Sequence, residues 1–171
     1  REGFVELGEL CRVHRGQVTG ANRIWISEHN EHGLPESVLF STVTKARELF
    51  ATQGALVDPM SLKRVIDLPV DLSAFDKSDR RRIDKFLIYA KNQGTHSGFI
   101  ASHRRAWWSV GLREPAPILA TYMARRPPVF VRNLADARHI NIAHGLYPRT
   151  DLNDVQLSTL ASFLSTSVSL N

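Results

Sequence analysis

Apolar and polar residues alternate in the first part of the chain. We interpret residues 9–14 as an alternating, half-buried strand in which Cys11 and Val13 face a core while Arg12 and His14 face out. The next apolar group, residues 23–27, predicts a second short strand. We expect the loop between them, which contains two glycines, to connect these two strands at the edge of a sheet.

A helical period replaces this alternation between Asp76 and Asn92. Four apolar residues spaced i, i+3, i+4 and i+7 share one face there: Ile83, Phe86, Leu87 and Ala90. Asp76 can cap the start of this helix and Gly94 can end it. Three arginines occupy positions 80–82, and we interpret them as a solvated face balanced by neighbouring aspartates rather than as phosphate contacts.

A second helical stripe closes the chain and predicts a C-terminal helix over residues 153–168. Its apolar members are Leu157, Leu160, Ala161, Leu164 and Val168. The period of the pattern, rather than the composition of the segment, indicates a helix.

The remaining segments are short and mostly rich in β-forming residues. Residues 62–70 predict a strand, whereas residues 39–50 fit either a strand or a helix. Residues 97–112 predict a short helix that runs into a strand over residues 107–112, with Trp108, Val110 and Leu112 on one face. Three further strand candidates follow, at residues 115–123, 127–134 and 137–143.

Such short connections favour antiparallel pairing over helical crossovers. The expected fold is therefore α+β. Short, mostly antiparallel strands form one or two twisted sheets, with a central helix and a C-terminal helix packed on them. We expect residues 1–171 to form a single domain.

Composition agrees with a globular domain, since 43% of the 171 residues are hydrophobic and 23% are charged. No apolar run is long enough to cross a bilayer, so no membrane partner is expected. Cys11 is the single cysteine, which excludes an internal disulfide and fits a cytoplasmic location. The chain starts at Arg1 without an initiator methionine, which predicts a piece of a longer protein.

The charge is +5, and arginine outnumbers lysine by 17 to 5. Eight arginines lie between residues 101 and 149: Arg104, Arg105, Arg113, Arg125, Arg126, Arg132, Arg138 and Arg149. Only Glu114 and Asp136 oppose them. The planar guanidinium suits phosphate and the guanine edge, so this half predicts either a polyanionic partner or a solvated basic surface.

The stretch HRGQVTGANRIWI, residues 14–26, contains a GxxxG loop. It lacks the lysine of a phosphate-binding loop and the GxGxxG spacing of a dinucleotide fingerprint. We expect a tight hairpin that depends on Gly16 and Gly20. Its hydrogen-bonding side chains are candidates for contacts with base edges or phosphates: Gln17, Thr19, Asn22 and Arg23.

The stretch SHRRAWW combines Arg104 and Arg105 with Trp107 and Trp108. Basic and aromatic residues together can stack bases or line a groove for a nucleic-acid backbone. In the alternative interpretation Trp108 anchors the core and the arginines are merely solvated.

Metal-binding and catalytic motifs are weak, and we expect neither kind of site in this chain. The histidines lack zinc-site spacing, and no GxSxG nucleophile motif occurs. Cys11 is expected to be inert on its apolar face. His139 and His144 fit hydrogen bonds at strand ends, or DNA contacts, better than metal coordination.

Taken in order, four segments resemble the C-terminal target-recognition domain of TaqI-like adenine-specific (exocyclic amino) DNA methyltransferases of bacterial restriction–modification systems. The first is VELGELCRVHRGQVTGANRIWI, with a G-x-x-T-G-x-N loop between two expected strands. The others are ASHRRAWWSVGL, PPVFVRNLADARHINIAHGLYP and DVQLSTLASFLSTS. Each segment alone is weakly specific, but their order extends over nearly the whole chain.

In that family the N-terminal part binds S-adenosylmethionine and methylates a flipped adenine with an Asn-Pro-Pro-Tyr/Phe motif. Neither motif is present here, and the single Pro-Pro pair follows Arg126. The resemblance therefore implies that this chain holds no cofactor and has no activity alone. S-adenosylmethionine is expected in the N-terminal methyltransferase domain of the same parent chain, while this part binds duplex DNA and selects the site.

From the family loop we carry over Gly16, Thr19, Gly20 and Asn22; the other candidates rest on their chemistry. The full expected DNA-binding set is Arg15, Gln17, Thr19, Asn22, Arg23, Arg104, Arg105, Trp107, Arg125, Arg126 and His144. One alternative is a protein-interaction module that docks onto a catalytic subunit through the exposed part of the Trp107–Trp108 pair. A small stand-alone hydrolase is another.

Overall fold

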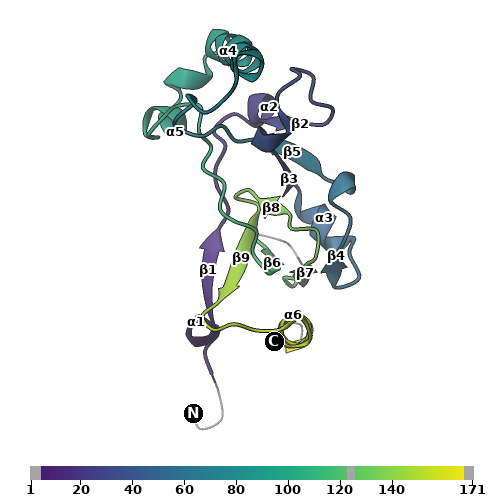
Figure 1. Ribbon diagram of the computed structural model, residues 1–171. Helices are drawn as coiled ribbons and strands as arrows, with labels where there is room; N and C mark the ends of the chain where they lie inside the picture. Colours follow the sequence, from purple (N-terminus) through teal and green to yellow (C-terminus); the bar gives the residue numbers. More distant parts are fainter. Residues whose placement is uncertain (1–4, 123–125, 168–171) are drawn as a thin grey trace.

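The computed structural model describes residues 5–122 and 126–167, and two open sheets form its centre (Figure 1). The first sheet has the strand order β1-β9-β6-β7-β4. Its strands are β1 (Cys11–Arg15), β9 (Ala143–Pro148), β6 (Ile118–Thr121), β7 (Phe130–Asn133) and β4 (Ala55–Leu56). Neighbouring strands are antiparallel except for the parallel pair β4 and β7.

The second sheet has the order β2-β5-β3-β8. Its strands are β2 (Ile26–Ser27), β5 (Lys63–Ile66), β3 (Leu39–Val43) and β8 (Arg138–His139). The pairs are antiparallel except for β3 and β8, which are parallel. The expected α+β class with mostly antiparallel strands is thus confirmed.

Helices lie at both ends of the molecule in Figure 1, with α2, α4 and α5 at one end and α1 and α6 at the other. The α-helices are α1 (Leu7–Leu10), α2 (Asn22–Trp25), α3 (Ala46–Phe50), α4 (Lys77–Asn92), α5 (Phe99–Ser102) and α6 (Asp154–Ser167). Three short 3₁₀ turns are η1 (Glu36–Val38), η2 (Pro59–Ser61) and η3 (Thr95–Ser97). Among the described residues, no helix has the length and apolar character needed to cross a membrane.

Helix α4 confirms the prediction from its apolar spacing. The Asp76 side chain accepts hydrogen bonds from the amides of Ser78 and Asp79, both at 2.8 Å, and Gly94 adopts a left-handed φ of 75° after the helix. The apolar face packs on the second sheet, with Phe86 only 1% exposed. The three arginines at its start are exposed, as expected. Arg80 pairs with Asp84, and Arg82 pairs with Asp79.

Helix α6 confirms the C-terminal helix that the second apolar stripe predicted. Leu157 and Ala161 are buried against Cys11 of β1 and against β6 and β9 of the first sheet. Val168 lies outside the described residues. Cys11 is buried as predicted, and burial raises the pKa of its thiol.

The expected inward orientation of Val13 is wrong, because this side chain is 43% exposed. Strand β1 lies at the edge of its sheet, and of its two apolar residues Cys11 belongs to the cluster beneath α6. The alternation of apolar and polar residues therefore correctly predicted that Cys11 is buried but not that Val13 is exposed.

The predicted strand at residues 23–27 is mostly wrong. Residues 22–25 form the helical turn α2, and only Ile26 and Ser27 are extended. Ile24 and Trp25 are both buried, which successive residues of a half-buried strand cannot be, because they point to opposite faces.

The predicted hairpin is also wrong. Strand β1 pairs with β9 and β2 pairs with β5, so the glycine loop passes from one sheet to the other. The predicted strand over residues 107–112 is not formed either. The amides of Gly111 and Leu112 donate to the Asp67 carboxylate, at 2.9 and 2.7 Å, instead of to a neighbouring strand.

The ambiguous segment 39–50 contains both alternatives, strand β3 followed by helix α3. Trp25, rather than Trp108, is the tryptophan that anchors the core. It is fully buried and meets Phe86 edge to face, with 5.7 Å between ring centroids. Trp108 is partly buried, and its indole N–H donates to the Pro69 carbonyl at 3.0 Å.

Candidate nucleic-acid interface

The glycine loop, residues 16–21, is fixed at its start by Gly16. A Cβ atom on Gly16 would lie 2.2 Å from the main-chain oxygen of Ile140, so no other residue fits there without a shift of the backbone. The Gly16 amide donates to the Ala143 carbonyl at 3.1 Å. Gln17 then forms a parallel bridge with Ile140, which ties the loop to the chain between β8 and β9.

Gly20 shapes the second half of the loop. Its φ of 76° is left-handed, and a Cβ there would lie 3.0 Å from the Cβ of Ile100. Thr19 is 2% exposed, and its hydroxyl donates to the side-chain oxygen of Asn22. Thr19 therefore stabilises the loop from inside, whereas Asn22 and Arg23 lie exposed at its end.

Arg104 supports the loop from a distant part of the sequence. Its guanidinium donates to the carbonyls of Val18 and Thr19, at 2.7 and 3.0 Å. Burial lowers the pKa of Arg104, and the charge of Asp67 opposes this shift. Arg104 thus supports the loop conformation, while the neighbouring Arg105 is exposed.

A groove of about 540 Å³ lies beside the Arg104 contact. This volume is within the range of ligand-binding pockets. Gln17 and Val18 of the loop line it together with Arg104, Arg105 and Gly111. Polar loop groups and an exposed cation therefore face a common hollow.

A second group of side chains adjoins the start of the loop. Arg15 ends β1 and lies opposite His144 of β9. The His144 ring stacks on Tyr122, with centroids 4.5 Å apart and planes inclined by 26°, and the Arg15 guanidinium lies 5.6 Å from the Tyr122 centroid. Burial, followed by the charge of Arg15, lowers the pKa of His144. The group therefore presents two stacked rings with one permanent cation.

Tyr122 was not among the sequence candidates. The signal that could have found it is its position in TYMARRPP, where an aromatic residue precedes an arginine pair. Arg125 lies outside the described residues. Arg126 is exposed, and its guanidinium lies 5.5 Å from the Phe50 ring centroid at the end of α3.

The structure describes seven of the eight arginines between residues 101 and 149, and four of these seven have main-chain hydrogen-bond partners. Four donate to main-chain carbonyls: Arg104, Arg132, Arg138 and Arg149. Arg132 is 5% exposed and also pairs with Asp154 at 3.1 Å. The exposed ones are Arg105, Arg113, Arg126 and Arg149. The arginine count alone therefore overstated the cationic surface of this half.

Trp107 belongs to an aromatic cluster rather than to the loop surface. Its ring centroid lies 6.3 Å from that of Trp25, 5.8 Å from that of Trp108 and 6.0 Å from that of His96. It is partly buried against the core. These neighbouring rings therefore cover part of the Trp107 surface that was expected to stack on bases.

Within residues 5–122 and 126–167, no group of three or more His, Cys, Asp or Glu side chains is placed to hold a metal ion. The glycine loop does not fit a nucleotide cofactor, since the Gly16 amide is bonded to Ala143 and the Thr19 hydroxyl to Asn22. What the loop leaves outward are the side chains of Gln17, Asn22 and Arg23, with Arg105 beside it.

The fold and this loop define the class of protein. It is an α+β domain that supports a conformationally fixed glycine loop. The resemblance found in the sequence places such a loop in the C-terminal part of a methyltransferase. The chain belongs to the family of the C-terminal domain of the Type II methyltransferase M.Eco57I, whose family model matches residues 1–170. The suspected family relationship is thus confirmed.

Two relatives support this assignment. The Type II methyltransferase M.XamI of Xanthomonas campestris pv. amaranthicola is 57% identical over 166 residues, which cover 97% of this chain and 32% of the relative. M.AccI of Acinetobacter calcoaceticus, also a Type II methyltransferase, is 22% identical over 169 residues, which cover 96% of this chain and 31% of the relative. The chain spans about a third of the length of both.

Proposed function

We propose that this chain is the part of a Type II adenine DNA methyltransferase that binds duplex DNA and selects the target site. Methyl transfer from S-adenosylmethionine belongs, in this proposal, to an N-terminal domain of the parent chain. The observation that carries the proposal is the fixed glycine loop, which holds exposed polar and cationic side chains in a defined arrangement.

The chemistry of these groups divides into two tasks. Arg15, Arg23 and Arg105 suit phosphate oxygens, which give affinity and register without sequence information. Gln17 and Asn22 are amides, and an amide pairs well with the adenine edge in the major groove. A fixed loop lowers the entropic cost of ordering these side chains when DNA binds.

The Tyr122–His144 stack adds a flat surface beside Arg15. An aromatic face with an adjacent guanidinium can pack against an unstacked base or against a sugar. This suits a protein whose partner domain acts on a base turned out of the duplex.

The test compares single arginine variants of the whole chain in duplex binding. Arg23→Ala and Arg105→Ala are each expected to weaken binding by about three- to tenfold and to lower the slope of log affinity against log salt by about 1. Arg82→Ala is the matched control, because Arg82 is an exposed arginine on α4 that pairs with Asp79. Equal effects of all three variants would contradict the assignment.

The alternative of a module that docks onto a catalytic subunit through Trp107 has less support, since Trp107 packs among Trp25, Trp108 and His96. A docking surface of different chemistry lies at the other end of the molecule.

A further inference from the structure

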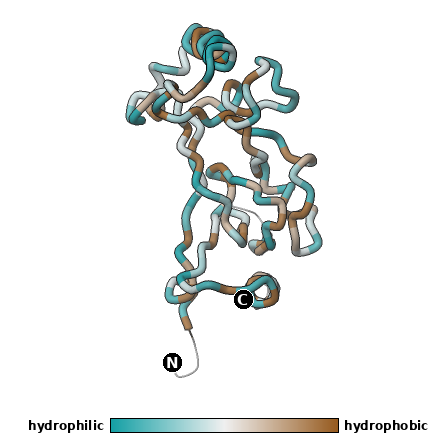
Figure 2. The backbone as a smooth tube through the Cα atoms, viewed as in Figure 1, coloured by the Kyte–Doolittle hydropathy of each residue, from teal (hydrophilic) through white to brown (hydrophobic). Residues whose placement is uncertain are grey.

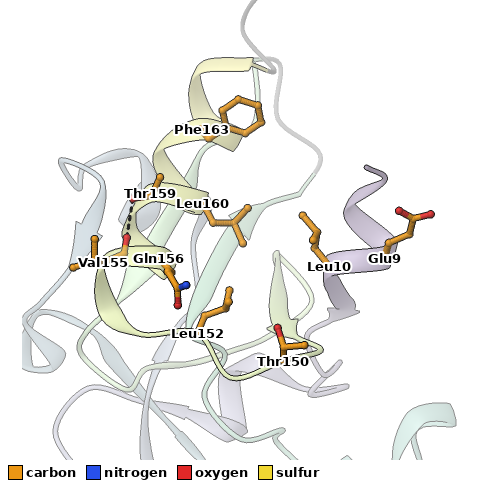
Figure 3. A pocket seen from close by; sticks show the side chains of 9 residues that line it. All are labelled: Glu9, Leu10, Thr150, Leu152, Val155, Gln156, Thr159, Leu160 and Phe163. Atoms are coloured by element: carbon orange, nitrogen blue, oxygen red, sulfur yellow. Dashed lines mark hydrogen bonds between the residues drawn. The ribbon is translucent and has the colours of Figure 1, made fainter. Parts of the chain in front are cut away.

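An apolar groove of about 450 Å³ lies between α1 and α6, at the end of β1 opposite to the glycine loop (Figure 3). Leu10 lines one side from α1, and Leu152 and Leu160 face it from the C-terminal segment. Two further apolar side chains at this site are strongly exposed, Val155 at 75% and Phe163 at 64%. Exposed apolar side chains that gather in one place mark an interaction surface.

The composition of α6 supports this interpretation. From residue 155 to residue 166 the helix carries no charged side chain, although many of its side chains are exposed. A solvated helix normally has charged residues on its outer face, as α4 does. Figure 2 shows the contrast: α4 mixes strongly hydrophilic with hydrophobic residues, whereas most of α6 is coloured from white to brown.

The lengths of the relatives favour one occupant for this surface, the polypeptide that precedes it. About two thirds of each relative lies outside the matched part, and the matched family is a C-terminal domain, so that the remainder precedes it in the chain. The polypeptide that precedes this part reaches it at α1, which itself lines the groove. A domain joined there is held close to the groove, which favours docking through a high effective concentration.

The position of the groove also leaves the glycine loop accessible. Helix α1 precedes β1 and the loop follows it, so the two surfaces lie at opposite ends of one strand (Figure 1). The charge differs as well, since Glu9 is the one charged residue that lines the groove. The groove therefore suits an apolar, uncharged protein surface and does not suit a polyanion.

We infer that the groove between α1 and α6 is the surface on which the preceding, N-terminal part of the parent methyltransferase docks. Val155 and Phe163 insert into that part, and Leu10 and Leu160 form the floor of the contact. The inference rests on the parent chain being longer than this segment, as its relatives are, but not on DNA binding.

The test uses the full parent chain with a protease site introduced just before this segment, and no DNA. After cleavage the two fragments are expected to stay together in gel filtration. The double variant Val155→Asp/Phe163→Asp is expected to weaken their association by at least about tenfold. Ile88→Asp is the matched control, because Ile88 is 62% exposed on the outer face of α4.

Thermal unfolding of each released C-terminal fragment verifies that the variants still fold. The inference is overturned if cleaved wild-type fragments separate, if the control variant weakens association as much as the double variant, or if the double variant only converts a dimer of this chain to a monomer. Duplex binding by the same fragments is measured separately, so failure of the docking surface and failure of the proposed DNA-binding function give different results.

Discussion

Gly16 determines the path of the glycine loop at the scale of a single residue. Any side chain there would meet the Ile140 carbonyl, while Gly8 in α1 has no atom within 4 Å of the position of a Cβ. The sequence alone does not distinguish these two glycines, but only Gly16 is required by its surroundings.

We predict that Gly16→Ala lowers the free energy of unfolding by about 3 kcal/mol or more, because the backbone must move to admit the methyl group. Gly8→Ala is expected to be neutral or slightly stabilising, since alanine favours a helix and has room there. Urea denaturation of both variants measures this. Equal stability of the two variants would show that the loop is less tightly held than described.

Arg104 and Arg105 are neighbours in the sequence but also differ in structural role, since Arg104 supports the loop and Arg105 is exposed. We predict that Arg104→Ala costs about 2–3 kcal/mol of stability, since the carbonyls of Val18 and Thr19 lose a charged donor. Arg105→Ala should change stability by less than about 0.5 kcal/mol, because the side chain is exposed. Denaturation midpoints decide this, and a stable Arg104→Ala protein would contradict the supporting role.

At the scale of the element, long periodic segments were predictable and short irregular ones were not. Helices α4 and α6 follow from apolar spacing, since a face must be buried wherever it repeats over several turns. Residues 22–25 and 107–112 were misassigned, because distant residues determine their conformation. Ile24 and Trp25 are buried together in the core beside Phe86. The amides of Gly111 and Leu112 donate to Asp67. A local pattern contains no information about such partners.

The residues of the candidate site also divide into those that a local motif predicts and those that depend on distant partners. Gly16, Gly20 and the exposed Asn22 were identified from the loop motif, which is local. The supporting role of Arg104 was not predictable, because 85 residues separate it from Thr19. Tyr122 was missed because its partner His144 lies on another strand.

The cap of α4 gives a prediction for one element. Asp76→Ala removes the acceptor for two amides at the first turn, and we expect a loss of about 1 kcal/mol. Asp151→Ala serves as a control, because Asp151 is an exposed aspartate that lies outside the helices. Thermal unfolding compares them. A loss for Asp151→Ala as large as that for Asp76→Ala would contradict the capping role.

At the scale of the whole molecule, His139 lies where the two sheets meet. It belongs to β8 of the second sheet, and a Cβ on Gly145 of β9 in the first sheet would lie 2.7 Å from its ring. The side chain is 2% exposed. Burial, assisted by the charges of His144, Arg113 and His14 and opposed by the His14 main chain, lowers the pKa of His139 to about 4.

The folded protein therefore holds His139 neutral, whereas the unfolded chain protonates it near its ordinary pKa of 6.5. This contribution to stability is complete above pH 6.5 and is lost as pH falls from 6.5 towards 4, by about 3 kcal/mol. His139→Leu should remove most of that pH dependence. His29→Leu, at a histidine whose side chain is 83% exposed, should keep it. Denaturation at several pH values tests this, and an unchanged slope in His139→Leu would contradict it.

We propose that this chain binds duplex DNA through a cationic surface around the fixed glycine loop. The most direct measurement is the affinity of the folded chain for duplex DNA in a mobility-shift assay at 50 and 200 mM salt. Three phosphate contacts, one each from Arg15, Arg23 and Arg105, predict binding at the lower salt and a loss of affinity of about 40-fold at the higher salt. A folded chain that does not bind at 50 mM salt, or whose affinity is the same at both salt concentrations, would contradict the account.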